Sequence, residues 1–168
     1  QLRVNGIQPL NISVDDYFVD KTRTPLDEDG KPDYESLETV DLDLFNNDLN
    51  TLLAGGEIDL PTFNFVTGMR EYRGKKLKLE EGQVLVIEGI HALNPKLTRD
   101  IRPENKFNIY ISAITSMRLD KHNRIPTTDL RLIRRIVRDF RYRGTSAART
   151  IDMWPSVRKG EERNIFPF

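Results

Sequence analysis

Two short apolar segments of the sequence end in carboxylates, and these carboxylates are the first candidates for chemistry. Asp15 comes directly after Ile12-Ser13-Val14, and Glu88 comes directly after Leu85-Val86-Ile87. If both segments are parallel strands, their carboxyl ends meet at one edge of a sheet, where α/β proteins bind their ligands. One carboxylate there can accept a proton while the other holds a metal ion or its water. Each acid alone could equally well cap the helix that follows.

An arginine-rich stretch provides the second group of candidates. Arg131, Arg134, Arg135 and Arg138 recur at spacings of three and four residues, which places them on one side of a helix. Phosphoryl transfer requires cations around the migrating group, and guanidinium groups match phosphate oxygens. Lysine would serve solubility equally well, and this stripe contains none. The pattern therefore predicts phosphate handling, with a solvated helix face or a nucleic-acid-binding surface as the alternatives.

The composition excludes several other kinds of site. None of the 168 residues is a cysteine, so the chain can form no disulfide, zinc–thiolate site or cysteine nucleophile. His91 and His122 lack metal-ligand spacing, and no serine-centred nucleophile motif occurs. The longest apolar run, Val84-Leu85-Val86-Ile87, is too short to span a bilayer, and no signal peptide is visible at Gln1. We therefore expect a soluble, cytoplasmic protein without membrane contact.

Charge sums to zero but is unevenly distributed along the chain. Acids dominate residues 15–59, and arginines dominate residues 124–163. An acidic part that faces a basic part suits a site for metal and polyphosphate, although two separate solvated surfaces would give the same pattern. A neutral chain gives no support to nucleic-acid binding, and we expect Phe140 and Tyr142 of the arginine helix to lie in the core rather than on a stacking platform.

The pattern of apolar residues predicts an α/β fold, with strands alternating with helices. The expected strands are residues 10–14, 58–66, 69–79, 83–87 and 106–112, of which 83–87 is expected to be buried on both faces. Asp41 is expected to cap a helix over 42–53, and Thr127 or Thr128 to cap the arginine helix, which stops at Gly144. A last helix is expected from Ser146 to the Trp154 region, limited by Pro155. The opening residues 1–4 are expected to be the tail of a helix.

Four motifs then occur in the order found in uridine kinases, and they span nearly the whole chain. They are Ile12-Ser13-Val14-Asp15-Asp16-Tyr17-Phe18, residues 58–66 (IDLPTFNFV), Val86-Ile87-Glu88-Gly89-Ile90 and residues 131–139 (RLIRRIVRD). The chain therefore resembles the uridine kinase and phosphoribulokinase family. The resemblance implies a P-loop kinase-type parallel sheet flanked by helices, with a small β-hairpin insertion and a helical lid. It also implies transfer of the γ-phosphoryl group of ATP, with Mg²⁺, to a nucleoside 5′-hydroxyl.

The resemblance also implies roles for individual residues. Asp15 corresponds to the general base beside the nucleoside 5′-hydroxyl, and Glu88 to the acid at the magnesium site. Glu35 stands where the family has an aspartate that contacts the ribose, and Arg131 resembles a ribose-contacting arginine. The lid helix, which closes over the phosphates, carries the catalytic residues Arg134, Arg135 and Arg138. The other implied substrate-binding residues are Tyr17, Phe63, Phe65, Arg70 and Arg158.

Within one partial P-loop kinase domain over residues 1–168, the resemblance implies three functional segments. These are an acceptor-side loop at about 19–39, a β-hairpin region at 58–79 and lid helices at 127–160.

The chain departs from the family pattern in three places. No Gly-x-x-x-x-Gly-Lys-[Ser/Thr] loop, the usual cradle for ATP phosphates, occurs in the 168 residues. Phe63 and Gly68 stand where pyrimidine kinases place a tyrosine and a histidine that read the base. The family's final strand would follow Phe168. We therefore expect a piece of a longer kinase, cut at both ends and inactive alone, which could form homo-oligomers. A related kinase with another sugar or small-molecule hydroxyl acceptor, or a non-catalytic RNA-binding module, remains the alternative.

Overall fold

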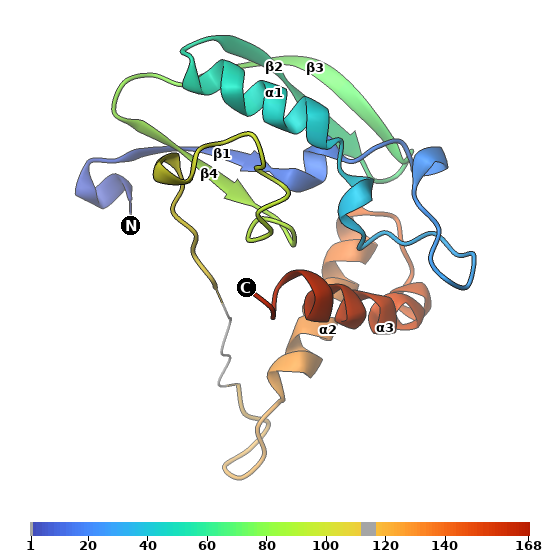
Figure 1. Ribbon diagram of the computed structural model, residues 1–168. Helices are drawn as coiled ribbons and strands as arrows, with labels where there is room; N and C mark the ends of the chain where they lie inside the picture. Colours follow the sequence, from blue (N-terminus) through green and yellow to red (C-terminus); the bar gives the residue numbers. More distant parts are fainter. Residues whose placement is uncertain (1, 112–116) are drawn as a thin grey trace.

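The two strands that end in carboxylates pair with each other. In the computed structural model, which describes residues 2–111 and 117–168, β1 (Gln8–Ser13) and β4 (Gln83–Glu88) form a two-stranded parallel sheet. The register places Ile12 beside Ile87 and Ser13 beside Glu88. Both strands point toward the side of the molecule where the C-terminal helices lie (Figure 1). The predicted mixed α/β fold with a parallel sheet is thus confirmed.

The expectation that the second of these strands is buried on both faces is wrong. Val84 is 39% exposed, and Leu85, Val86 and Ile87 are only half-buried. An apolar run identifies a strand, but its burial depends on how many layers cover it. In the described residues β4 pairs with β1 alone.

The first long helix and the hairpin form as predicted. The Asp41 side chain accepts a hydrogen bond from the Leu44 amide (3.1 Å) and so caps α1 (Leu42–Leu53). Strands β2 (Glu57–Asn64) and β3 (Met69–Lys78) pair antiparallel. Helix α1 packs along β2, and in Figure 1 the helix and the hairpin both lie above the parallel sheet. The apolar residues that meet there form the core: Ile12, Val14, Tyr17, Val40, Phe45, Leu49, Leu52, Ile58, Leu60, Leu97 and Ile101.

Helices α2 (Thr127–Tyr142) and α3 (Ala147–Asn164) pack against each other near the carboxyl ends of β1 and β4 (Figure 1). Neither predicted threonine caps α2, because Pro126 occupies the capping position and no side chain caps that end. Helix α3 begins at Ser146, as predicted, but continues through Pro155. A proline inside a helix costs about 3 kcal/mol, and the buried residues beyond it outweigh that cost by packing: Val157, Gly160, Glu161 and Asn164.

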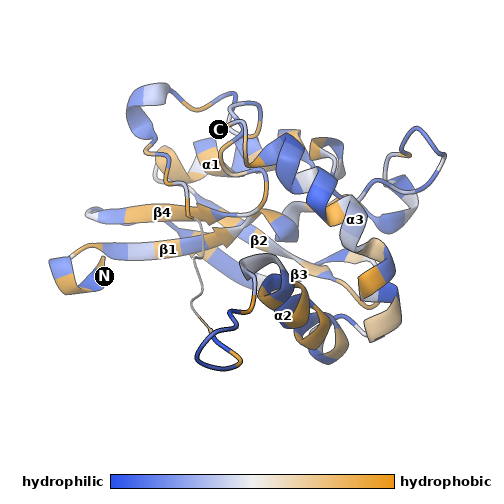
Figure 2. Ribbon diagram, turned by 90° about the horizontal axis from the view of Figure 1, so that it is seen from below, coloured by the Kyte–Doolittle hydropathy of each residue, from blue (hydrophilic) through white to orange (hydrophobic). Residues whose placement is uncertain are grey.

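The apolar side of α2 is exposed, contrary to the expectation that it lies in the core. Ile133 is 48%, Val137 45%, Phe140 72% and Tyr142 73% exposed. Figure 2 shows this hydrophobic side along the helix. Amphipathicity identifies residues that share a face but does not decide which face turns inward. Here Arg135 and Asp139 turn inward instead.

The expected strand at 106–112 does not form in the described residues, where it has no pairing partner. Residues 106–111 form no strand, and Phe107, Ile109 and Ile111 are 88%, 64% and 82% exposed, while Ser112 lies outside the described residues. Residues Arg3–Asn5 form a single 3₁₀ turn that ends at Gly6 in the left-handed conformation, and Gln1 lies outside the described residues, so the expected helix tail at 1–4 stays a prediction. Residues 19–39 are largely irregular, as predicted, with short 3₁₀ turns. No helix in the described ranges is long and apolar enough to cross a bilayer.

Candidate active site

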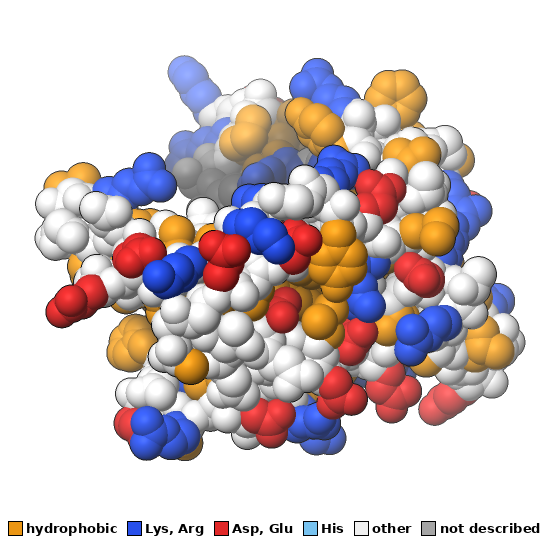
Figure 3. All heavy atoms as spheres, turned by 90° about the horizontal axis from the view of Figure 1, so that it is seen from above, with side chains coloured by type: hydrophobic (Ala, Val, Ile, Leu, Met, Phe, Trp, Pro, Cys, Tyr) orange, Lys and Arg blue, Asp and Glu red, His pale blue; other side chains and the backbone are white. Residues whose placement is uncertain are grey.

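One cleft of about 540 Å³ brings together the acidic and basic parts of the chain. It lies where β1 and β4 end, and the acceptor-side loop, the hairpin and the two C-terminal helices surround it. Among the residues that line it are eight of the predicted site residues: Asp15, Glu35, Phe63, Phe65, Glu88, Arg131, Arg135 and Arg138. The acidic first part therefore faces the basic last part instead of forming a separate surface. On the face seen in Figure 3 the two signs of charge are interspersed.

The two strand-end carboxylates lie at one edge of the sheet, as the sequence predicted. Ser13 Oγ donates a hydrogen bond to Glu88 Oε1 at 2.5 Å, which ties the two strand ends together. Burial, and to a lesser extent the negative charge of Glu88, raise the pKa of Asp15, while Arg143 opposes this shift. The neighbouring Asp16 points elsewhere, since its Oδ1 accepts a hydrogen bond from the Phe63 amide (3.2 Å) and fastens the hairpin to the sheet.

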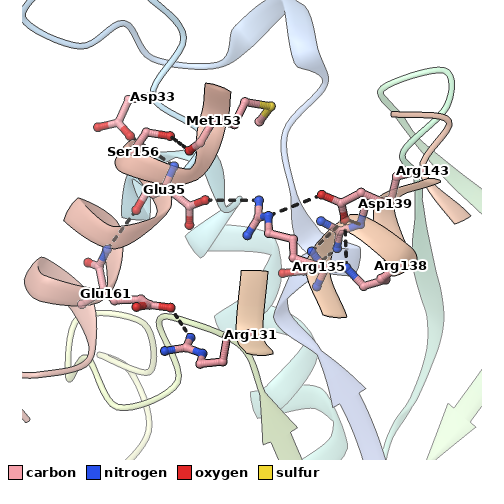
Figure 4. A network of polar contacts seen from close by, with 12 residues as sticks. Asp33, Glu35, Arg131, Arg135, Arg138, Asp139, Arg143, Met153, Ser156 and Glu161 are labelled. Carbon is pink, nitrogen blue, oxygen red and sulfur yellow. Dashed lines mark hydrogen bonds and ion pairs between the residues drawn. The ribbon is translucent and has the colours of Figure 1, made fainter. Parts of the chain in front are cut away.

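A network of alternating charges crosses the cleft (Figure 4). Arg135 lies between two acids, with Nη2 3.8 Å from Glu35 Oε1 and Nε 3.4 Å from Asp139 Oδ2. Arg143 likewise lies between Asp139 (3.8 Å) and Asp15, to which it donates a hydrogen bond of 3.2 Å. The arginines of α2 therefore reach carboxylates from the loop and from the strand end, which sequence spacing alone did not specify.

Helix α3 closes the other side of the cleft through a buried acid. Glu161 is 2% exposed and accepts hydrogen bonds from Arg131 and from Arg158, the latter at 2.6 Å. A Cβ atom on Gly160 would lie 2.6 Å from Glu35 Cβ, so only glycine allows this approach of helix to loop. Burial raises the pKa of Glu35, and the facing Arg135 opposes that rise.

Aromatic rings form the wall on the hairpin side. Phe63 and Phe65 meet edge to face at 5.1 Å, and Phe18 meets Phe63 in the same way at 5.6 Å. The guanidinium of Arg143 lies over the Phe65 ring, 3.9 Å from its centroid. At the rim, Lys21 packs on Gly68 so closely that a Cβ there would lie 2.9 Å from the lysine Cβ.

Four predicted site residues do not line the cleft. Tyr17 is fully buried in the core, where its hydroxyl donates to Asp48 Oδ2 at 2.9 Å. Arg70 pairs with Asp41 at 3.0 Å, Arg134 is exposed, and Arg158 touches the cleft only through Glu161.

Sequence reasoning missed several residues that the structure brings to the site, and three of them take part in the charge network: Asp139, Arg143 and Glu161. The signal for Asp139 was its place within the arginine stripe, where a lone acid must face its cationic neighbours. Arg143 follows the stripe by five residues, just before Gly144, so helical periodicity did not include it. Nothing in the sequence indicates that Glu161 belongs to the site, because it does not distinguish Glu161 from the neighbouring Glu162. The structure shows Glu161 buried and Glu162 exposed.

The residues at the sheet edge are compatible with a magnesium ion held mainly by other ligands. No group of three or more potential metal-ligating acids or histidines occurs in residues 2–111 and 117–168. Mg²⁺ characteristically keeps waters and binds through one or two carboxylates plus substrate phosphates. Glu88, with the Ser13 hydroxyl beside it, provides oxygen ligands of this kind.

Comparison with known proteins gives consistent matches. A family model described as the phosphoribulokinase / uridine kinase family matches residues 10–167. A uridine kinase of Streptococcus thermophilus is 30% identical over 88% of this chain and 62% of its own length. A uridine kinase of Streptococcus pneumoniae is 30% identical over 88% and 61%, and one of Lactobacillus helveticus is 28% identical over 85% and 59%. The chain thus spans 59–62% of the length of these curated relatives.

Proposed function

The chain belongs to the phosphoribulokinase and uridine kinase family, and from this we propose that it transfers the γ-phosphoryl group of ATP to the 5′-hydroxyl of a nucleoside. Its mixed α/β fold with a parallel sheet is of the P-loop kinase type. One observation carries the proposal. Asp15, at the end of β1, lies in the same cleft as Glu88 and a group of arginines, so a base, a metal ligand and phosphate-binding cations converge.

In the proposed reaction, Asp15 is the general base. It accepts the proton of the acceptor hydroxyl as that oxygen bonds to the γ-phosphorus. The bond from this phosphorus to the β–γ bridging oxygen then breaks, and ADP leaves. The raised pKa of Asp15 suits proton acceptance better than an ordinary aspartate would. Among the described residues only Arg143 donates to its side chain, at Oδ2, so Oδ1 is available to the hydroxyl.

The arginines of the lid helices supply the cations for phosphoryl transfer. Arg135 and Arg138 line the cleft, and we propose that they contact the phosphates, with Arg134 joining from the outer side. Glu88 and Ser13 would hold Mg²⁺, which supplies neutralisation of the phosphate charge when bound. Since the 168 residues contain no glycine-rich phosphate loop, we propose that they are inactive on their own.

For the acceptor, the aromatic wall and the ribose-side residues are the proposed contacts. Phe63 and Phe65 offer rings to a planar base, and Glu35 and Arg131 offer polar groups to a sugar. Tyr17 and Arg70 support this wall from behind by contacts with α1. Tyr17 bonds to Asp48, which lies within the helix, and Arg70 pairs with Asp41, which caps its start. Arg158 acts through Glu161, which also holds Arg131.

A second candidate is a related kinase with a different hydroxyl acceptor, and the rim of the aromatic wall favours it. Gly68 has a φ of +72°, and Lys21 covers it, so no side chain that reads a base fits there. The aliphatic stem of Lys21 takes that place instead, and we propose that its ammonium group suits an acceptor with a carbonyl or anionic group. An RNA-binding module has less support, because Arg131, Arg135 and Arg143 are already paired with carboxylates.

The test is a phosphoryl-transfer assay on the full natural chain with ATP, Mg²⁺ and a panel of acceptors. Transfer to uridine or cytidine is the expected result, and it should vanish in Asp15→Asn. Transfer only to a non-nucleoside sugar or alcohol would establish the second candidate. No transfer to any hydroxyl compound, combined with tight RNA binding that weakens steeply with salt and survives Arg131→Ala, would overturn both.

A further inference from the structure

A single buried aspartate contacts three arginines of the cleft. Asp139 is 5% exposed, and its Oδ1 accepts hydrogen bonds from Arg138 at 2.9 to 3.0 Å. Arg135 pairs with its other oxygen at 3.4 Å, and Arg143 Nε lies 3.8 Å from Oδ1. Its backbone carbonyl also accepts hydrogen bonds from the amides of Arg143 (3.0 Å) and Thr145 (3.1 Å). Asp139 therefore fixes both the side chains and the turn from which Arg143 extends.

Two of these arginines are also within reach of a competing acid. Glu35 faces Arg135 at 3.8 Å, and Asp15 faces Arg143 at 3.2 Å. Each guanidinium therefore lies between Asp139 and a second carboxylate on its cleft side, an arrangement that Figure 4 shows for Arg135. Without the helix-side partner, a half-buried guanidinium would turn fully to the cleft-side acid, because an unpaired buried charge is costly.

We propose that Asp139 is the positioning residue that keeps Arg135 and Arg143 available to phosphate; this rests on the proposed phosphoryl-transfer function. Asp139 does not touch the substrate. It shares the two arginines with Glu35 and Asp15, so that neither arginine is fully captured by the acceptor-side acids. An incoming polyphosphate can then displace the cleft-side carboxylate, Glu35 or Asp15, while Asp139 keeps the guanidinium paired.

Simple electrostatics predicts the opposite outcome for the loss of this charge. Removal of a negative charge beside three arginines raises the local positive potential and should tighten the binding of a polyanion. Positioning predicts weaker binding, because the released arginines are captured by Glu35 and Asp15. The sign of the change in affinity therefore separates the two accounts.

The experiment compares Asp139→Asn with Asp152→Asn in the full natural chain. Asp152 lies exposed on α3 with no described partner, so its substitution makes the same charge change without the contacts. Calorimetric titration with inorganic tripolyphosphate should show a Kd about five- to tenfold weaker for Asp139→Asn and within about twofold of wild type for Asp152→Asn. With ATP and uridine, Asp139→Asn should lower kcat by about tenfold or more while the KM for uridine changes less than about threefold.

Two further variants keep the outcome decisive. Asp139→Glu retains the charge and should bind tripolyphosphate within about threefold of wild type. If Asp139→Asn fails to fold by circular dichroism, Asp139→Ser, which leaves room for water, takes its place with the same expected result. A folded, charge-free variant that binds tripolyphosphate as tightly as wild type, or more tightly, overturns the proposal. If wild type does not phosphorylate uridine, the proposed function fails, whereas the tripolyphosphate comparison still tests Asp139.

Discussion

Replacement of Glu161 by glutamine tests whether the buried acid of α3 holds α2 and α3 together beside the cleft. Its side chain is 2% exposed and accepts hydrogen bonds from Arg131 and Arg158. Glutamine has nearly the same shape but no charge. Its oxygen can accept from one arginine, while its amide group then faces the other, donor against donor. The substitution therefore removes one charged hydrogen bond and weakens the second.

The expected cost follows from the exposure of the partners. A hydrogen bond to a charged group contributes about 1.5–3 kcal/mol, so two such bonds set an upper limit of about 3–6 kcal/mol. Arg131 and Arg158 are 40% and 31% exposed, so both regain water when the acid is neutralised, which reduces the loss. We expect Glu161→Gln to lower the free energy of unfolding by roughly 1.5–3 kcal/mol, which corresponds to a fall in Tm of roughly 3–12 °C.

Thermal melts followed by circular dichroism measure this directly, and Glu162→Gln is the matched control. Glu162 is the next residue of the same helix and is exposed, so its substitution should change Tm by no more than about 2 °C. If Glu161→Gln melts within about 1 °C of wild type, the two arginine contacts do not stabilise the helix, and the reasoning is refuted. Equal losses in both variants would point instead to a general effect of charge on α3.

Three other changes follow from the same cleft. Asp15→Asn should lower turnover by about two to four orders of magnitude with ATP binding nearly intact. Burial and Glu88 raise the pKa of Asp15, and the base acts only when deprotonated, so on acidification the wild-type rate should begin to fall at a pH above 3.8, the ordinary pKa of an aspartate. A pH–rate profile that stays flat down to pH 3.8 would refute this role. Arg135→Ala should reduce kcat at least about tenfold more than Arg134→Ala, since only Arg135 lines the cleft, and equal effects would contradict that assignment. Gly160→Ala should push Glu35 away, lower the free energy of unfolding by about 1–3 kcal/mol and raise the KM for the acceptor. An unchanged melting curve together with an unchanged KM would show that the contact between Gly160 and Glu35 is not tight.

The sequence predicted those parts of the fold in which local chemistry and tertiary packing agree. Asp41 caps α1 because its side chain reaches an amide three residues on, which requires nothing distant. The hairpin turns near Gly68, where φ is +72°, a value that glycine adopts without strain. Asp15 and Glu88 share a sheet edge because any two neighbouring parallel strands end on the same side.

The failures share a physical cause, which is that the deciding partner lies far away in the sequence. Residues 106–111 have strand-like composition, but no described strand pairs with them, so they remain irregular. Pro155 ends a helix when nothing else holds the next turn, whereas here Val157 and Glu161 pack beyond it. Local preferences were read correctly in both places; residues 106–111 lack a pairing partner among the described residues, and around Pro155 distant contacts outweigh the local preference.

The orientation of α2 shows why the site was less predictable than the fold. An apolar stripe normally turns to the core, yet Val137 and Phe140 are 45% and 72% exposed while Arg135 and Asp139 are turned inward. Burial of guanidinium groups requires partners, and Glu35 and Asp15 provide them from positions 100 and 128 residues away in the sequence. The acid-rich loop and the arginine helix therefore depend on each other for their orientation. The charges that would serve phosphoryl transfer are thus the same charges that hold the cleft together in the ligand-free protein, so any polyphosphate must compete with carboxylates of the protein for these arginines.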